Sequence, residues 1–237
     1  MSDEVTTQMT TAINAKPYPY ELPENKPCLI IIDMQKDFID PGGFGEILGN
    51  DVSLLSSIIP TTQKLLATFR VLNLPVIHTR ECHNPDLSDC PPSKIARGKG
   101  ALTIGSAGPM GRILIDGEEG NAIIDALKPI AGEYEMTKPG KGAFYNTLLQ
   151  EILKSLDVSH LVLAGVTTEV CVQTTMREAN DRGYECLLVE DCTESYFPEF
   201  KKATLEMIVA QAGIVGWTAN CEDTITGLKE AYGKIIW

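Results

Sequence analysis

The stretch CLIIID, residues 28–33, decides the fold class of this chain. An apolar run without alternation is typical of a strand buried on both faces of a parallel sheet. Between residues 54 and 69, leucines and isoleucines recur at helical spacing. Further strand-like runs follow at residues 76–79, 134–137, 161–164, 187–189 and 214–217. The alternation predicts an α/β fold, in which helices cover both faces of a parallel sheet.

The helical segments carry their own boundary signals. Asn146 and Asn220 precede apolar-periodic segments and are suitable N-caps, and Gly183 is a standard residue just past a helix end. We therefore expect helices over residues 123–127, 146–156, 168–182, 199–212 and 221–232.

The sequence is organised as one domain preceded by a short arm. Residues 1–27 are proline-rich towards their end and are expected to form an extended arm, in which Tyr18 and Tyr20 pack on the domain or on a neighbouring subunit. Residues 28–237 form the domain, without an internal repeat or a second boundary. The glycine- and proline-rich segment 80–120 has little periodicity, and a loop of that length is usually functional.

The composition excludes several classes of partner. The chain has 237 residues and a formal net charge of −12, with no tract rich in Lys or Arg. This charge repels polyanions, so nucleic acid and anionic membrane are not expected partners. No signal peptide and no membrane-spanning run is visible, and a cytoplasmic location is expected.

The seven cysteines are expected to be free thiols, because their number is odd and the chain carries no export signal. No C-x-x-C occurs and there are only three histidines, so a structural zinc site is not expected. His83, beside Cys82 and near Asp86, has two interpretations: a member of a ligand cluster, or a polar loop histidine, which is the commoner case.

Two charged residues stand at expected strand ends, where parallel sheets bind ligands. Asp33 directly follows the first strand, and a poorly hydrated carboxylate there is suited to proton transfer. The alternative is an Asp that caps the next turn. Lys138 ends the third strand and precedes Pro139, which favours an extended conformation. Its alternative is a solvated lysine in a turn.

Cys171 follows the fourth strand, in GVTTEVC at residues 165–171. With Thr168 as the N-cap, Cys171 would lie in the first helical turn, where N–H groups stabilise a thiolate or an oxyanion. Most cysteines are inert core residues, and Cys28 and Cys186 are interpreted in that way.

The strand ending in Asp33, the Lys138-Pro139 segment and GVTTEVC together resemble the isochorismatase-like cysteine hydrolases. The resemblance spans residues 17–220 and is strongest to biuret hydrolases, through PYPY, IIIDMQKDF, HTRECHNPDLSDCP, KPGKGAF, GVTTEVCVQTTMREANDRGYECLLVEDC and MIVAQAGIVG. It implies a three-layer α/β/α fold with a six-stranded parallel sheet of order 3-2-1-4-5-6, and a cis peptide bond between Val166 and Thr167.

The resemblance also implies a cysteine-dependent amidohydrolase with the catalytic triad Asp33, Lys138 and Cys171. The oxyanion hole would be formed by the backbone N–H groups of Thr167 and Cys171. Nicotinamidase relatives carry a metal motif of one Asp and two His after the second strand. Here that region contains His83 alone, so neither a metal nor a cofactor is expected. Isochorismatases act on an enol ether without a cysteine nucleophile, so Cys171 argues against that substrate.

The resemblance extends to substrate binding. Lys141 and Gln211 resemble residues that bind ureido carbonyls and amides, although Gln211 could instead be a helix-end amide bonded to backbone. Phe38 and Phe44 would either wall the pocket or belong to the core, and the loop 41–51 is lid-like. Biuret, cleaved to allophanate (urea-1-carboxylate) and ammonia, is the favoured small-molecule substrate. The alternatives are triuret, ureidoacrylate, N-carbamoylsarcosine, or no catalysis at all in a binding protein on the same fold. The family implies a homo-oligomer, with a tetramer as the expected size.

Overall fold

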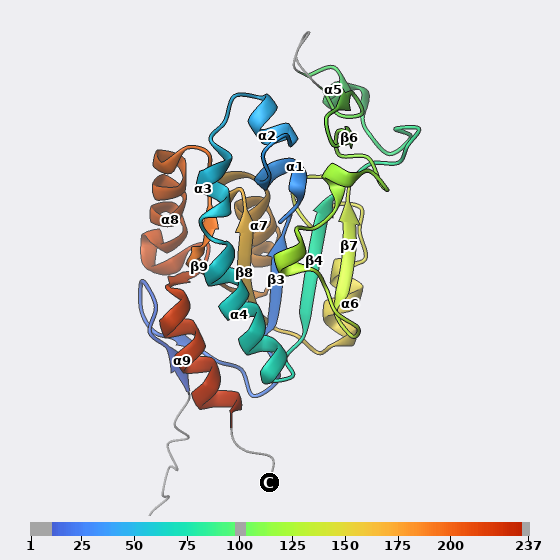
Figure 1. Cartoon of the computed structure of the whole chain (residues 1–237). Helices are drawn as coiled ribbons and strands as arrows, with labels where there is room; N and C mark the ends of the chain where they lie inside the picture. The colour runs from blue at the N-terminus through green and yellow to red at the C-terminus, as the bar shows by residue number, and fades with distance from the viewer. Residues whose placement is uncertain (1–10, 98–102, 234–237) are drawn as a thin grey trace, which may run out of the picture.

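A six-stranded parallel sheet forms the centre of the computed structural model, which describes residues 11–97 and 103–233 (Figure 1). The strand order is β10-β9-β8-β3-β4-β7, and every neighbouring pair is parallel. In chain order this is 3-2-1-4-5-6, so the predicted topology is confirmed. The strands are β3 (Cys28–Ile32), β4 (Val76–Glu81), β7 (Tyr134–Lys138), β8 (His160–Val166), β9 (Glu185–Glu194) and β10 (Trp217–Ala219).

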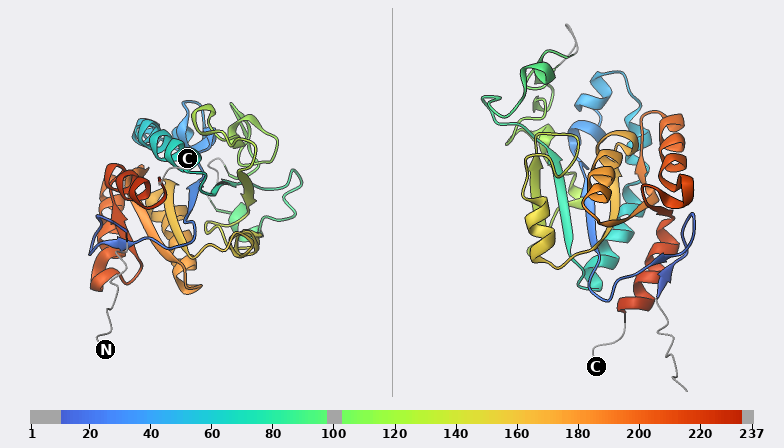
Figure 2. Two further views of the ribbon diagram at one scale, coloured as in Figure 1. Left: turned by 90° about the horizontal axis from the view of Figure 1, so that it is seen from below. Right: turned by 180° about the vertical axis from the view of Figure 1, so that it is seen from behind.

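Two apolar cores lie on the two faces of the sheet. Strand β3 contributes to both, because Leu29 and Ile31 face one core while Ile30 and Ile32 face the other. This is why the run CLIII is apolar throughout. Figure 2 shows the helices on both sides. The first core is covered by α3 (Val52–Ser56), α4 (Ile59–Val71) and α9 (Cys221–Tyr232), the second by α6 (Leu149–Ser155), α7 (Gln173–Asp181) and α8 (Pro198–Gly213).

The helix boundaries follow some of the sequence signals and not others. The Asn220 side chain accepts from the N–H of Asp223, and Gly183 takes φ +83° after α7, as predicted. Asn146 is not a cap, because it has φ +58° and α6 begins at Leu149. The last strand begins at Trp217, later than predicted, because the preceding residues turn the chain.

The described part of the proline-rich arm, residues 11–27, contains a hairpin of β1 (Ala12–Ile13) and β2 (Tyr20–Glu21), and residues 1–10 lie outside the described residues. Tyr20 is buried, its ring centroid lies 5.3 Å from that of Trp217, and its hydroxyl donates to the carbonyl of Glu185 at 3.0 Å. Tyr18 also packs edge-on against Trp217. Both tyrosines therefore contact their own domain. The apolar end of the chain, residues 235–237, lies outside the described residues.

The connections after β3 and β4 gather at the carboxyl edge of the sheet, at the top of Figure 1. None of the helices in the described ranges has the length and apolar character that crossing a membrane requires. The short elements at this edge and beside it are α1 (Lys36–Ile39), α2 (Phe44–Ile47), α5 (Pro92–Ile95), β5 (Ala107–Gly108), β6 (Gly111–Arg112), η1 (Glu119–Asn121) and η2 (Asp125–Leu127).

Candidate active site

Asp33 and Lys138 form a buried ion pair at the carboxyl edge of the sheet. Lys138 Nζ lies 2.7 Å from Asp33 Oδ2, and neither side chain is exposed. The other carboxylate oxygen of Asp33 accepts from the Thr79 hydroxyl at 2.8 Å, and Lys138 also donates to the carbonyl of Gly140 at 3.0 Å. Burial opposes the ammonium charge, yet Asp33, Cys171 and Glu81 raise the pKa of Lys138 above its ordinary value. Lys138 is therefore held in its charged form.

Cys171 lies where β8 passes into a helix. The peptide bond between Val166 and Thr167 is cis, as the family resemblance implied. A π-helical turn, η3 (Thr168–Val172), then runs directly into α7. Thr168 is not the N-cap, because its hydroxyl is shared with that of Thr193 at 2.8 Å and Thr167 takes the cap position. Cys171 is nonetheless in the first turn, and it is only 5% exposed.

Glu81, the last residue of β4, is a second buried carboxylate that the sequence reasoning missed. Its Oε2 lies 3.7 Å from Cys171 Sγ, and its side chain is 1% exposed. Lys141 Nζ lies 2.8 and 2.9 Å from the two carboxylate oxygens, and Lys94 Nζ lies 2.8 Å from Oε1. Burial would raise the pKa of Glu81, but Lys138, Lys141 and Lys94 lower it to about 2. Its position at a strand end, like that of Asp33, was the available signal.

The thiol of Cys171 does not receive the net stabilisation as a thiolate that its helical position suggested. Burial is the main influence and raises the pKa of Cys171 well above its ordinary value. Lys138 and Lys141 lower it, while Asp33 and Glu81 raise it. The resting side chain is therefore a thiol, and it needs a base when it attacks.

A cavity of about 300 Å³ opens beside the thiol. Of the predicted site residues, Phe38, Lys141, Thr167 and Cys171 line it. Phe44 does not line it, although its neighbours Leu48 and Asn50 do. The wall also contains Glu169 and Tyr196, which sequence reasoning had not singled out.

Gln211 lies away from this cavity. Phe197, at the start of α8, lines the cavity, whereas Gln211 is exposed near the opposite end of the same helix. Gln211 and Ala212 have φ of +51° and +60°, so the chain leaves helical geometry at this point. Within one chain, Gln211 is not brought together with the catalytic candidates.

The residues around the thiol are poorly suited to a divalent metal. Asp33, Glu81 and Cys171 offer ligand atoms within 4.8 Å of one another. Both carboxylates are already ion-paired with lysine ammonium groups, which would repel a cation. His83 lies between Asp89 at 3.2 Å and Lys94 Nζ at 2.9 Å, so both of its ring nitrogens have partners. The cluster suggested by its neighbours in sequence does not form, because Asp86 bonds to Ser88 instead.

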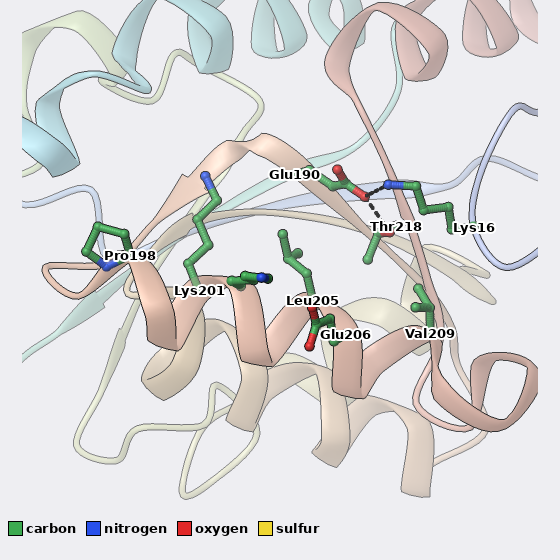
Figure 3. A pocket seen from close by; sticks show the side chains of 9 residues that line it. Lys16, Glu190, Pro198, Lys201, Leu205, Glu206, Val209 and Thr218 are labelled. Carbon is green, nitrogen blue, oxygen red and sulfur yellow. Dashed lines mark hydrogen bonds and ion pairs between the residues drawn. The ribbon is translucent and has the colours of Figure 1, made fainter.

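A different cavity, of about 290 Å³, lies beside α8 (Figure 3). Leu205 and Val209 form its apolar wall, and Lys16 pairs there with Glu190. Among the described residues that line it there is no cysteine or histidine. The candidate active site is therefore the cavity beside Cys171.

Comparison with known proteins shows the family of the chain. The isochorismatase domain profile matches residues 27–220. Ureidoacrylate amidohydrolase RutB of Yersinia enterocolitica is 31% identical over 221 residues, which cover 89% of this chain and 92% of RutB.

Solved structures share the fold. A cysteine hydrolase from Pseudomonas syringae pv. phaseolicola superposes with a TM-score of 0.76 at 23% identity, covering 89% of this chain and 96% of that one. N-carbamoylsarcosine amidase from Thermoplasma acidophilum superposes with a TM-score of 0.64 at 25% identity, covering 83% and 97%. The profile match, the relative and the shared fold together show that this chain belongs to the isochorismatase family.

Proposed function

We propose that this protein is a cysteine amidohydrolase that cleaves a terminal amide of a small ureido compound. The observation that carries the proposal is the convergence of Cys171 with Asp33 and Glu81 within 4.8 Å, next to a cavity large enough for a small molecule. The catalytic triad of the proposal is Asp33, Lys138 and Cys171.

In the proposed reaction, Asp33 takes the thiol proton as Sγ of Cys171 bonds to the amide carbonyl carbon. Backbone N–H groups of Thr167 and Cys171 hold the oxyanion. The C–N bond then breaks, and Asp33 returns the proton to the leaving ammonia. A water molecule, deprotonated by Asp33, hydrolyses the thioester and releases the thiol. Lys138 keeps Asp33 oriented at 2.7 Å and balances the charge that moves between Asp33 and the sulfur.

Biuret, converted to allophanate and ammonia, is the proposed substrate. Lys141 directs two of its ammonium protons to Glu81, which leaves the third for a substrate carbonyl. Phe38 supplies an apolar wall. No arginine is among the described residues that line the cavity, and arginine is the usual partner of a substrate carboxylate. Triuret, ureidoacrylate and N-carbamoylsarcosine are the alternatives, the last two through the names of the relatives.

A homotetramer in the cytoplasm is part of the proposal. Large apolar side chains are exposed along α8 and beside its ends, a pattern that favours contact with another copy of the chain. Two copies paired antiparallel along α8 would bring Gln211 of one beside the cavity of the other. This arrangement reconciles the expected role of Gln211 with its distance from its own cavity. The exposed side chains are those of Phe197, Phe200, Met207 and Ile214.

The test is ammonia release from a panel of biuret, triuret, ureidoacrylate, N-carbamoylsarcosine and nicotinamide, with Cys171→Ala as the blank. We expect biuret to give the highest kcat/KM. Nicotinamide has one amide on an apolar ring and would leave polar groups of the site unpaired, so it should be a poor substrate. Release from none of the ureido compounds would refute the amidohydrolase, and the binding-protein alternative would replace it. Equal turnover of nicotinamide and biuret would refute the ureido preference alone.

A further inference from the structure

Most side-chain polar groups in the wall of the cavity already have partners in the protein. The Tyr196 hydroxyl donates to the carbonyl of Phe38 at 2.6 Å, and Asn50 donates to the carbonyl of Gly45 at 3.1 Å. Both oxygens of Glu81 are bound by lysine. These groups therefore have little capacity left to accept hydrogen bonds from a substrate.

Glu169 differs from these groups. It lines the cavity from the π-helical turn that also carries Cys171. Its Oε2 is inaccessible to solvent and has no hydrogen-bond partner among the residues that the structure describes. A buried acceptor without a donor is unfavourable, and more so when it is charged. Rotation of the carboxylate would bring Oε2 into the cavity, where a ligand N–H group would remove this penalty.

Two residues that line the cavity therefore offer opposite hydrogen-bonding character. Lys141 presents an ammonium proton, which suits a carbonyl oxygen, and Glu169 presents a carboxylate oxygen, which suits an amide N–H. A neutral carbamoyl group carries both partners. A substrate carboxylate in the same place would meet Glu169 with like charge and without a proton to donate.

We propose that Glu169 is a specificity-determining residue, which accepts a hydrogen bond from the neutral carbamoyl end of the substrate and disfavours ureido compounds that end in a carboxylate. The inference rests on the proposed function and narrows its substrate class to uncharged ureido amides. The expected substrate of this chain would then differ from ureidoacrylate and N-carbamoylsarcosine, the compounds for which two of its relatives are named.

The test compares biuret with N-carbamoylglycine, which shares the ureido end of biuret and carries a carboxylate at the other. Glu169→Gln keeps the size of the side chain and removes its charge. We expect the ratio of kcat/KM for biuret to that for N-carbamoylglycine to fall roughly tenfold or more. Glu169→Asp keeps the charge and should keep a preference for biuret. Glu222→Gln, on the exposed first turn of α9, is the matched control and should leave the ratio unchanged.

The outcomes separate this inference from the proposed function. A wild-type enzyme that releases ammonia from neither compound would overturn this inference, and release from none of the ureido compounds in the panel would refute the proposed function as well. A wild-type enzyme active on biuret, together with an unchanged ratio in a folded Glu169→Gln variant, would overturn the role of Glu169 alone. A wild-type preference for N-carbamoylglycine would also overturn it. Thermal unfolding and circular dichroism establish that each variant is folded, and if Glu169→Gln is not, Glu169→Ala gives the same comparison.

Discussion

Glu81 Oε2 lies 3.7 Å from Sγ of Cys171, so the thiol faces two buried carboxylates, Asp33 and Glu81. Lysines offset both acids: Lys138 pairs with Asp33, and Lys141 and Lys94 pair with Glu81. Lys94 comes from α5, in the segment between β4 and β7, so a connecting segment contributes directly to the charge balance around the thiol.

The first prediction concerns stability in acid. The pKa of Glu81 is lowered from 4.5 to about 2, so its ion pairs stabilise the fold above pH 4.5 and this contribution is lost as the pH falls towards 2. The difference in unfolding free energy between wild type and Glu81→Gln should therefore shrink by on the order of 2–3 kcal/mol between pH 6 and pH 2.5. Urea titrations of both proteins measure it. A difference that is independent of pH would contradict the ion-pair account.

The second prediction concerns the thiol. Cys171→Ala should lose turnover by a factor of about 10³ or more while its thermal unfolding stays close to that of wild type. Because burial and the two carboxylates raise the pKa of Cys171, its alkylation by iodoacetamide should accelerate as the pH rises above 9. Glu81→Gln removes one of those carboxylates and should speed the reaction at pH 8. Mass spectrometry after partial labelling identifies the site. Labelling of Cys82 or Cys90 first, with activity retained, would argue against Cys171 as the nucleophile.

The third prediction concerns the buried ion pair. Lys138→Met leaves the Asp33 charge buried without its partner, so it should destabilise the protein by about 3–5 kcal/mol. Asp33→Asn in the same chain should recover part of that stability, but activity should be absent from both variants. Lys128→Met is the matched control, because Lys128 pairs with Asp125 at the exposed surface and its loss should change stability little. Equal losses of stability in Lys138→Met and Lys128→Met would refute the conclusion that the buried pair stabilises the protein more than a surface pair.

The alternation of strands and helices and the strand-end places of three charged or nucleophilic residues were predictable because each depends on local pattern, whereas the sheet order was implied by the family resemblance. Asp33, Lys138 and Cys171 each follow or end a strand, and parallel strands bring such ends to one edge. Glu81 also ends a strand, yet the sequence VIHTRE does not show which cations neutralise it. Those cations arrive from Lys94 and Lys141 in distant connections.

The position of Gln211 could not be read from the sequence for a related reason. Helical spacing predicted one helix over residues 199–212, and α8 does occupy that range. The departure at Gln211 and Ala212 depends on two consecutive residues with positive φ, which neither residue type signals. Tertiary packing, and not local preference, decides whether the end of that helix lies beside a cavity.

The fourth prediction is that activity does not depend on a metal. The two carboxylates nearest the thiol are neutralised by lysines, and a divalent cation would have to displace these ammonium groups. Dialysis against EDTA should therefore leave kcat/KM for biuret within about twofold of its starting value. Metal analysis of the dialysed protein serves as the control. Loss of activity that zinc restores would show that the ion pairs give way to a metal site.

The last prediction tests the proposed assembly through Gln211. If this residue acts on the cavity of a neighbouring chain, Gln211→Ala should lower kcat/KM by about five- to a hundredfold, the loss expected for one or two hydrogen bonds to substrate. Cys171→Ala is inactive in its own cavity but still carries Gln211. Co-expression of the two variants should therefore restore wild-type kcat/KM to part of the cavities, since a Gln211→Ala chain supplies the thiol and its neighbour supplies the amide.

Activity per intact thiol, measured against each variant expressed alone, reports the recovery, and light scattering reports the assembly. A particle that scatters as a monomer at micromolar concentration would exclude the arrangement. An oligomer without recovery would show that Gln211 does not serve a neighbouring cavity, and its exposed position on α8 would then have no part in substrate binding.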